Sequence, residues 1–291
     1  MGSYRERPPP ADLAGHLRCT WTAVTGRPGT VLPDGCLDLM WLGGELVVAG
    51  PDTGPAPSSL AVGTEIAAVR FRQGAAPAVL GVPAAELRDQ RVPLVELWSG
   101  GGELSRRVDA AADPAGRVAV LQTAVRRRLA DAPPVDLVAL AVAAALGPRG
   151  VRSGGPAIRP MRRAAPDDAG VAAALDPRGV RTGGPAIRPT RRAAPDSAGV
   201  VAALAARAGL SERQLHRRCL AAFGYGAKTL DRVLRLQRFL ALGRASPTAS
   251  LAQLAAEAGY ADQAHLGHDC RGLAGATPTE LLARSPPTAL E

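Results

Sequence analysis

The sequence predicts an α+β protein with an N-terminal β-barrel-like domain and trailing helices, a disordered linker, and a C-terminal all-α domain. Three observations lead to this prediction. Short apolar runs separated by glycine, proline and aspartate fill residues 1–91. A 29-residue segment occurs twice in tandem, and residues 198–291 show helical periodicity between capping residues. At 291 residues the chain has room for two ordinary domains.

The β-rich part, residues 1–91, is predicted from strand-like runs bounded by turn residues. LDLMWL and ELVVAG flank a Gly-Gly turn, and IAAVRF adds a further run. Many short strands at this spacing are typical of a small barrel or a jelly roll. Trp41, Arg70 and Arg72 are candidates for lining an effector pocket. Core packing for the tryptophan and solvated strand faces for the arginines are the alternatives.

Helices are expected over residues 92–146. The middle one, GRVAVLQTAVRRRLA, has an apolar stripe opposite three consecutive arginines, and such a run is more often a solvated face than a nucleic-acid patch. Together with the β-rich part these helices form the first predicted domain, residues 1–146. Its one histidine, His16, cannot supply the several histidines of a metal-dependent cupin site. We therefore predict no metal, no cofactor and no enzymatic activity.

Residues 147–197 form the predicted linker. The segment VAAALGPRGVRSGGPAIRPMRRAAPDDAG is followed directly by a second copy that differs at four positions. Repeats often mark a solenoid, but these copies carry proline, glycine and arginine in place of the apolar faces that bury a core. The composition therefore predicts a disordered basic tether that leaves the two domains without a fixed geometry. Its arginines could add non-specific phosphate contacts.

Charge is uneven along the chain. Residues 1–141 carry a net charge of −1, residues 142–199 carry +6 and residues 200–291 carry +4, which together give the +9 of the chain. A basic tail behind a nearly neutral domain indicates a part that binds a polyanion. The chain has no apolar run as long as a membrane span or a signal-peptide core, and its four cysteines form no CxxC pair. We therefore expect a cytoplasmic protein with reduced thiols.

Residues 198–291 are predicted to hold two helix-turn-helix units joined by one long helix. In the first unit a helical run ends at Gly209, and Ser211 is placed to cap the next helix. In the second unit Ser250 and Asp262 are placed as the two caps. Between the units, TLDRVLRLQRFLALGR predicts a continuous amphipathic helix that holds them at a fixed separation. One such unit could be an ordinary helical hairpin, whereas two in register are a stronger indication.

The second helix of each unit carries polar side chains suited to phosphate oxygens and base edges on its outward face. These candidate DNA-binding residues are Arg213, His216, Arg217 and Arg218 in the first unit, and Gln263, Ala264, His265 and His268 in the second. The last two histidines and Cys270 have a spacing that could hold a metal. With Cys270 turned inward, DNA contact and core packing are the expected roles.

The segments LAARAGLSERQLHRRCLAAFGYG, LRLQRFLALGR and LAQLAAEAGYADQAHLGHDCRGLAGATPTELL resemble the DNA-binding domain of AraC/XylS-type transcription regulators. The family marker, a GYxDQAHL segment followed by a G-x-TP close, stands at residues 259–266 and 275–278. The resemblance implies a seven-helix domain whose two recognition helices enter successive major-groove segments of DNA, about 34 Å apart.

The sequence departs from that family pattern at matched positions. Cys219 and Cys270 stand where the recognition helices usually bury a phenylalanine, and His268 stands where an arginine is common. The cysteines are expected to pack as small apolar side chains. A neutral imidazole is a weaker anchor than a guanidinium, so the second helix is expected to hold DNA less firmly.

Three N-terminal segments, PDGCLDLMW, AGPDT and VRFRQGAAPAVLGVPAAEL, also resemble the domain often joined to such a head, a cupin-like barrel followed by helices that commonly carry dimerisation. The resemblance implies a sequence-specific DNA-binding transcription regulator, modulated by a small effector or by dimerisation through its N-terminal domain. The expected partners are double-stranded promoter DNA, RNA polymerase, a small-molecule effector and a second copy of the chain, with no membrane.

Two other functions stay open at this point. Some alkyl-transfer proteins of DNA repair join a zinc-held cysteine domain to an AraC-type head. They need four clustered cysteines, and residues 1–146 contain only Cys19 and Cys36. The chain could also be a binding module that no longer regulates, damaged by expansion of its linker, although the intact head argues against this.

Overall fold

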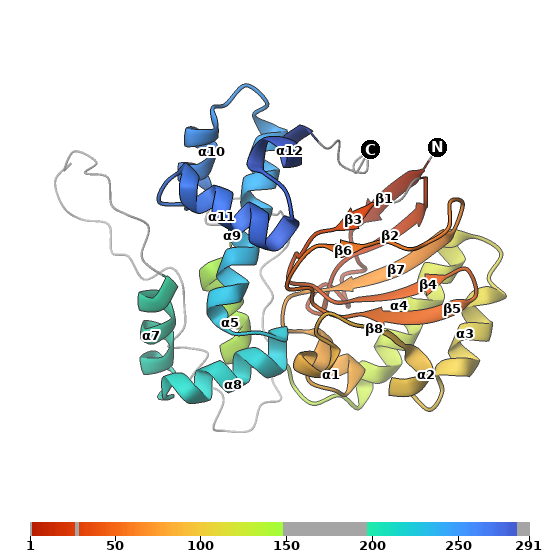
Figure 1. The fold of residues 1–291 in the computed structure, drawn as a ribbon. Helices are drawn as coiled ribbons and strands as arrows, with labels where there is room; N and C mark the ends of the chain where they lie inside the picture. Colours follow the sequence, from red (N-terminus) through yellow and green to blue (C-terminus); the bar gives the residue numbers. More distant parts are fainter. Residues whose placement is uncertain (1, 27–28, 148–196, 284–291) are drawn as a thin grey trace.

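The computed structural model of the protein describes residues 2–26, 29–147 and 197–283. A sheet-rich N-terminal domain lies beside a C-terminal helical domain (Figure 1). The predicted linker, with its tandem repeat, lies outside the described residues except at its two ends. None of the described helices is long and apolar enough to cross a membrane.

The N-terminal domain is built on one six-stranded antiparallel sheet in the order β1-β2-β7-β4-β5-β8. Strands β1 and β8 lie at its two edges, so the predicted barrel takes the form of an open sheet, with a separate two-stranded sheet of β3 and β6. The predicted hairpin is confirmed: β4 pairs with β5 across a glycine turn with positive φ. The strands are β1 (Ser3–Arg7), β2 (Leu17–Val24), β3 (Thr30–Val31), β4 (Asp38–Leu42), β5 (Glu45–Ala49), β6 (Ala56–Pro57), β7 (Glu65–Phe71) and β8 (Arg91–Pro93).

The two faces of this sheet have different surroundings, because side chains alternate along each strand. On β7, Val69 and Phe71 join the larger core together with Leu121 of the covering helices. Ile66 and Ala68 of the same strand face the opposite side, where Trp21 packs. The covering helices are α1 (Ala76–Leu80), the 3-10 helix η1 (Ala84–Leu87), α2 (Leu94–Leu97), α3 (Gly101–Asp109) and α4 (Pro114–Ala130).

The helix α5 (Leu137–Leu146) belongs to the C-terminal core, which differs from the predicted domain boundary at residue 146. Its side chains Val138 and Val142 are buried in one cluster with Leu215 and Leu230 of the C-terminal helices. The sequence could not show which core this helix joins, because VDLVALAVAAAL is apolar on nearly every side and its pattern does not indicate the element it packs against. The two domains are therefore joined by residues 131–136, and residues 148–196 connect two helices of one core.

The C-terminal domain is all-helical, as predicted. Its further helices are α7 (Ser197–Arg207), α8 (Glu212–Phe223), α9 (Ala227–Ala245), α10 (Leu251–Ala258), α11 (Gln263–Ala274) and α12 (Pro278–Ala283). With α5, the described residues contribute seven helices to this domain, the number that the resemblance implies. Helix α8 lies near one end of α9, and α10 to α12 gather around the other end (Figure 1). The long predicted helix is confirmed as α9.

Candidate nucleic-acid interface

Both helix-turn-helix units begin their helices at side-chain caps. The Ser211 hydroxyl accepts a hydrogen bond from the Gln214 backbone N–H, and the Gln214 side chain accepts one from the Ser211 backbone N–H at 2.8 Å. Ser250 and Gln253 form the same reciprocal pair at the start of α10. Asp262 caps α11. Each cap satisfies N–H groups that a helix start leaves unpaired, so the predicted helix starts are confirmed and fixed by local sequence.

The inward face of each recognition helix is closed by apolar packing. Cys219 of α8 and Cys270 of α11 are both fully buried, free thiols. Burial raises the pKa of Cys219 to about 11 and that of Cys270 to about 12, so both remain protonated at neutral pH. They act as small core side chains, as predicted, and Cys270 is turned away from the outward histidines.

The four candidate residues of α8 divide between two directions. Arg213, His216 and Arg217 are exposed, and their spacing of three and four residues puts them on one face. Arg218 is turned toward α5, where its Nη1 donates to the Asp136 carboxylate at 3.0 Å. The same carboxylate caps α5 by accepting from two backbone N–H groups. Arg218 therefore ties α8 to α5, and the first three residues form the outward face.

The candidate residues of α11 also differ in their surroundings. Gln263, Ala264 and His268 are exposed. His265 is partly buried: its ring meets Tyr260 edge-on, 5.2 Å between centroids, and its Nε2 lies 4.0 Å from the Asp269 carboxylate. Asp269 is buried and accepts a hydrogen bond from Arg232 Nε of α9 at 2.8 Å. His265 thus lies at the junction of α11 and α9, next to the exposed residues Gln263, Ala264 and His268.

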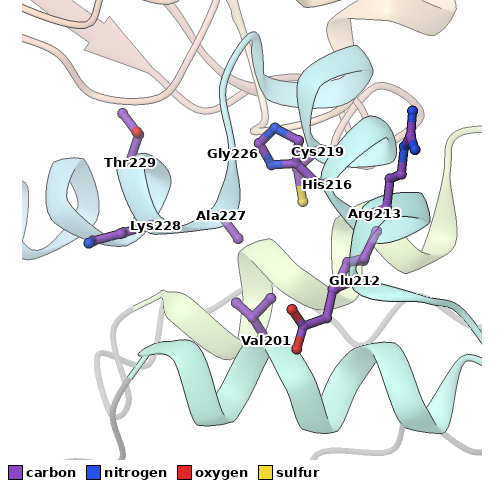
Figure 2. Close-up of a pocket in the computed structure, with 10 residues that line it drawn as sticks. Val201, Glu212, Arg213, His216, Cys219, Gly226, Ala227, Lys228 and Thr229 are labelled. Atoms are coloured by element: carbon purple, nitrogen blue, oxygen red, sulfur yellow. The ribbon is translucent and has the colours of Figure 1, made fainter.

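A hollow of about 650 Å³ lies beside α8, between α7, α8 and the start of α9 (Figure 2). Leu215 and Cys219 line its apolar side, and Arg213 and His216 contribute polar side chains. Lys228, from the first turn of α9, lines it as well. It is not among the residues that the sequence analysis predicts. The sequence feature that points to Lys228 is its position two residues after Gly226, the residue at the start of α9, which provides no side-chain cap.

The residues suggested for a pocket in the N-terminal domain do not converge. Trp41 is buried on the helix-covered face of the sheet, with the Arg117 guanidinium 4.0 Å from its ring centroid. Arg70 lies on the opposite face and pairs with Asp38 at 2.8 Å. Arg72 donates to a backbone carbonyl at 2.6 Å. Trp41 therefore packs in the core, as its alternative role predicted, whereas Arg70 is held in an ion pair and Arg72 in a hydrogen bond to the backbone.

The front-domain cysteines lack the features of a reactive centre. Cys19 and Cys36 are buried and unpaired. Burial raises the pKa of the Cys19 thiol to about 12 and that of Cys36 above its usual range, whereas an attacking thiolate needs a lowered pKa. Within residues 2–26, 29–147 and 197–283 no group of three or more histidine, cysteine and acidic side chains could hold a metal ion.

Comparison with known proteins gives two family matches. Residues 204–284 match a helix-turn-helix domain, and residues 5–93 match a domain of unknown function (DUF6597). No curated protein matches the sequence. Among solved structures, an apo variant of ToxT from Vibrio cholerae aligns over 91% of this chain and 96% of that chain, with 10% identity and a TM-score of 0.42. A likeness this distant carries no argument. Neither family match is described as a repair or alkyl-transfer protein.

Proposed function

We propose that this chain, a DNA-binding transcription regulator of the AraC type, reads two successive major-groove segments with α8 and α11. The observation that carries the proposal is the arrangement of two capped helices, each with an exposed polar face, at the two ends of one helix. Helix α9 has 19 residues and is therefore about 28 Å long. That length is comparable with the spacing of about 34 Å between major-groove segments on one face of DNA.

The exposed side chains fit the chemistry of base edges. Arg213 and Arg217 are suited to the O6 and N7 acceptors of guanine, Gln263 to adenine, and Ala264 to the methyl group of thymine. His216 and His268 complete the two faces as hydrogen-bonding side chains. The DNA-reading set proposed from the structure therefore keeps six of the eight candidates, and gives Arg218 and His265 positioning roles.

Contacts to the DNA backbone are proposed for the hollow beside α8. Lys228 supplies a cation and Thr229 a hydroxyl, which together suit a phosphate. Such contacts would position α8 in the groove and carry no sequence information. They would make binding sensitive to salt, because each neutralised phosphate releases counterions.

The regulatory partners belong to the same proposal. The resemblance to AraC-type regulators supports RNA polymerase as a partner at the promoter, a small-molecule effector or a second copy of the chain acting through the N-terminal domain, and a place in the cytoplasm. Trp41 and Arg70 lie on opposite faces of the sheet, so we propose that Trp41, Arg70 and Arg72 do not line one effector site together.

The proposal is tested by selecting fragments of the host genome on the purified full-length protein and titrating the best fragment. Specific binding should exceed binding to a scrambled fragment by at least about a thousandfold at physiological salt. Arg217→Ala should remove much of that preference, and Lys228→Ala should lower the affinity for both fragments to the same extent. Equal affinity of the unsubstituted protein for both fragments would contradict sequence-specific reading.

A further inference from the structure

The two domains touch at the elbow between α8 and α9, residues 223–226. The end of α8 points toward the N-terminal domain near α1 (Figure 1). Phe223 and Tyr225 are buried, and a Cβ placed on Gly74 of the N-terminal domain would lie 3.0 Å from Phe223 Cε1. Arg88 Nη1, from the residue after η1, donates to the Gly224 carbonyl at 3.3 Å. The recognition helix of the first unit therefore ends against the other domain.

A turn of the N-terminal domain, residues 33–36, forms the second part of this contact. Gln237 Nε2 of α9 donates to the Pro33 carbonyl at 2.7 Å. Gly35 has φ of 78°, and a Cβ there would lie 3.3 Å from Leu230 Cδ1 and 3.5 Å from the Tyr225 hydroxyl oxygen. The turn is thus closely packed against both α9 and the elbow, at a position where glycine is favoured.

The same turn is anchored within its own domain. The Asp34 carboxylate accepts from the Cys36 backbone N–H at 2.8 Å and lies 3.5 Å from Arg70 Nη1. Arg70 belongs to the central strand β7 and also pairs with Asp38 of β4. The turn is therefore tied to the sheet on one side and to the first helix-turn-helix unit on the other.

The chain path adds a third connection to α8. Because α5 lies in the C-terminal core, residues 131–136 alone lead from the N-terminal domain into it. The last of them, Asp136, pairs with Arg218 of α8. Helix α8 is thus held at its end by Arg88, at the elbow by the turn, and along its side by Asp136. For α11 the polar partners that the structure shows, such as Arg232, come from the C-terminal domain itself. Its C-cap Gly275 approaches the N-terminal domain, where a Cβ would lie 3.4 Å from Pro55 Cγ, but no hydrogen bond or ion pair is shown there among the described residues.

We infer that the N-terminal domain is a brace that fixes the orientation of the first recognition helix, with Arg88, Gln237 and Tyr225 as positioning residues. This inference rests on the proposed function. Holding α8 in its DNA-reading orientation before binding lowers the ordering cost of association. The consequence is asymmetric: a change at Arg88 or at the turn of residues 33–36 acts on the half-site read by α8 and leaves the half-site read by α11 unaffected. The two domains therefore make a defined contact, whereas the sequence predicted that they have no fixed geometry relative to each other.

The test uses the full-length double variant Arg88→Ala, Gln237→Ala, which removes the two hydrogen bonds across the contact. We expect about tenfold weaker binding to the intact operator, from two bonds of ordinary net strength. On an operator whose α8 half-site is scrambled, the variant and the unsubstituted protein should bind equally. An equal loss on both operators, no loss, or tighter binding would overturn the inference.

A second readout needs no DNA and so separates this inference from the proposed function. Amide hydrogen exchange should become faster in α8, residues 212–223, and stay unchanged in α11, residues 263–274. Unchanged exchange in α8 would overturn the brace even if the operator assay fails for lack of specific binding. Arg126→Ala removes an ion pair with Asp12 inside the N-terminal domain and is the matched control, expected to leave α8 unchanged. The single variant Gln237→Ala is measured beside the double variant; faster exchange in α11 as well as in α8 in both variants would overturn the asymmetry.

Discussion

Arg217→Ala separates base reading from phosphate positioning on α8. The Arg217 side chain is exposed on the outward face and forms no ion pair with the described residues, so removing it leaves no buried group unpaired. A bidentate arginine–guanine pair contributes about 1–3 kcal/mol of discrimination. We therefore expect operator affinity to fall about 5- to 150-fold, with affinity for scrambled DNA within about twofold of the unsubstituted protein. Fluorescence anisotropy titrations on both DNAs measure this.

The neighbouring residue Arg218 supplies the matched control. Its pair with Asp136 joins side chains that are 45% and 29% exposed, so losing it should cost about 0.2–1 kcal/mol of unfolding free energy. Arg218→Ala should therefore change operator affinity much less than Arg217→Ala. Lys228→Ala should lower the affinity for both DNAs equally. It should also reduce the slope of log affinity against log salt concentration by about 0.9. Equal losses from Arg217→Ala on operator and scrambled DNA would show that Arg217 contacts only phosphate, which refutes the assignment.

Further predictions concern stability and reactivity. Ser250→Ala should lower the free energy of unfolding by about 1 kcal/mol, seen in urea titration, because it removes the cap of α10. Asp269→Ala should cost about 3 kcal/mol in the same assay, since it leaves Arg232 without its buried partner. Cys19 should resist iodoacetamide at pH 8 in the folded protein, because burial raises its pKa to about 12; rapid labelling would revive the alkyl-transfer alternative. Deleting residues 148–176, one period of the repeat, leaves 20 residues to join α5 to α7, and we expect these to suffice. The melting temperature should therefore stay within a few degrees of that of the full chain. A larger drop would contradict this expectation.

The parts of the fold that sequence reasoning predicted are those encoded by neighbouring residues. Ser211 with Gln214, and Gly209 two residues earlier, specify the turn of the first unit within a few positions. The hairpin of β4 and β5 is encoded in the same way, by alternating residues around a glycine turn. In each case the residues that form the structure are adjacent in sequence, so the pattern itself shows the contact.

The parts that it missed depend on partners far apart in the chain. The pair of Arg218 and Asp136 is one such contact, because the two residues are 82 positions apart and the helical pattern around Arg218 predicts only an outward, DNA-facing side chain. Gln237 was one polar residue on an amphipathic helix, and its acceptor, Pro33, is 204 residues away. Nothing local distinguishes a side chain that meets DNA from one that meets another domain, because both lie on the polar face of a helix. The contact between the domains therefore became visible only in the structure.

The most direct test of the central claim is a hydroxyl-radical footprint of the full-length protein on its selected genomic operator. Two recognition helices held by α9 predict two protected segments on one face of the DNA, with centres about 34 Å apart. Substituting Arg217 should weaken protection at one segment, and substituting Gln263 should weaken it at the other. A single protected segment, or uniform protection that disappears with modest salt, would contradict two-headed reading.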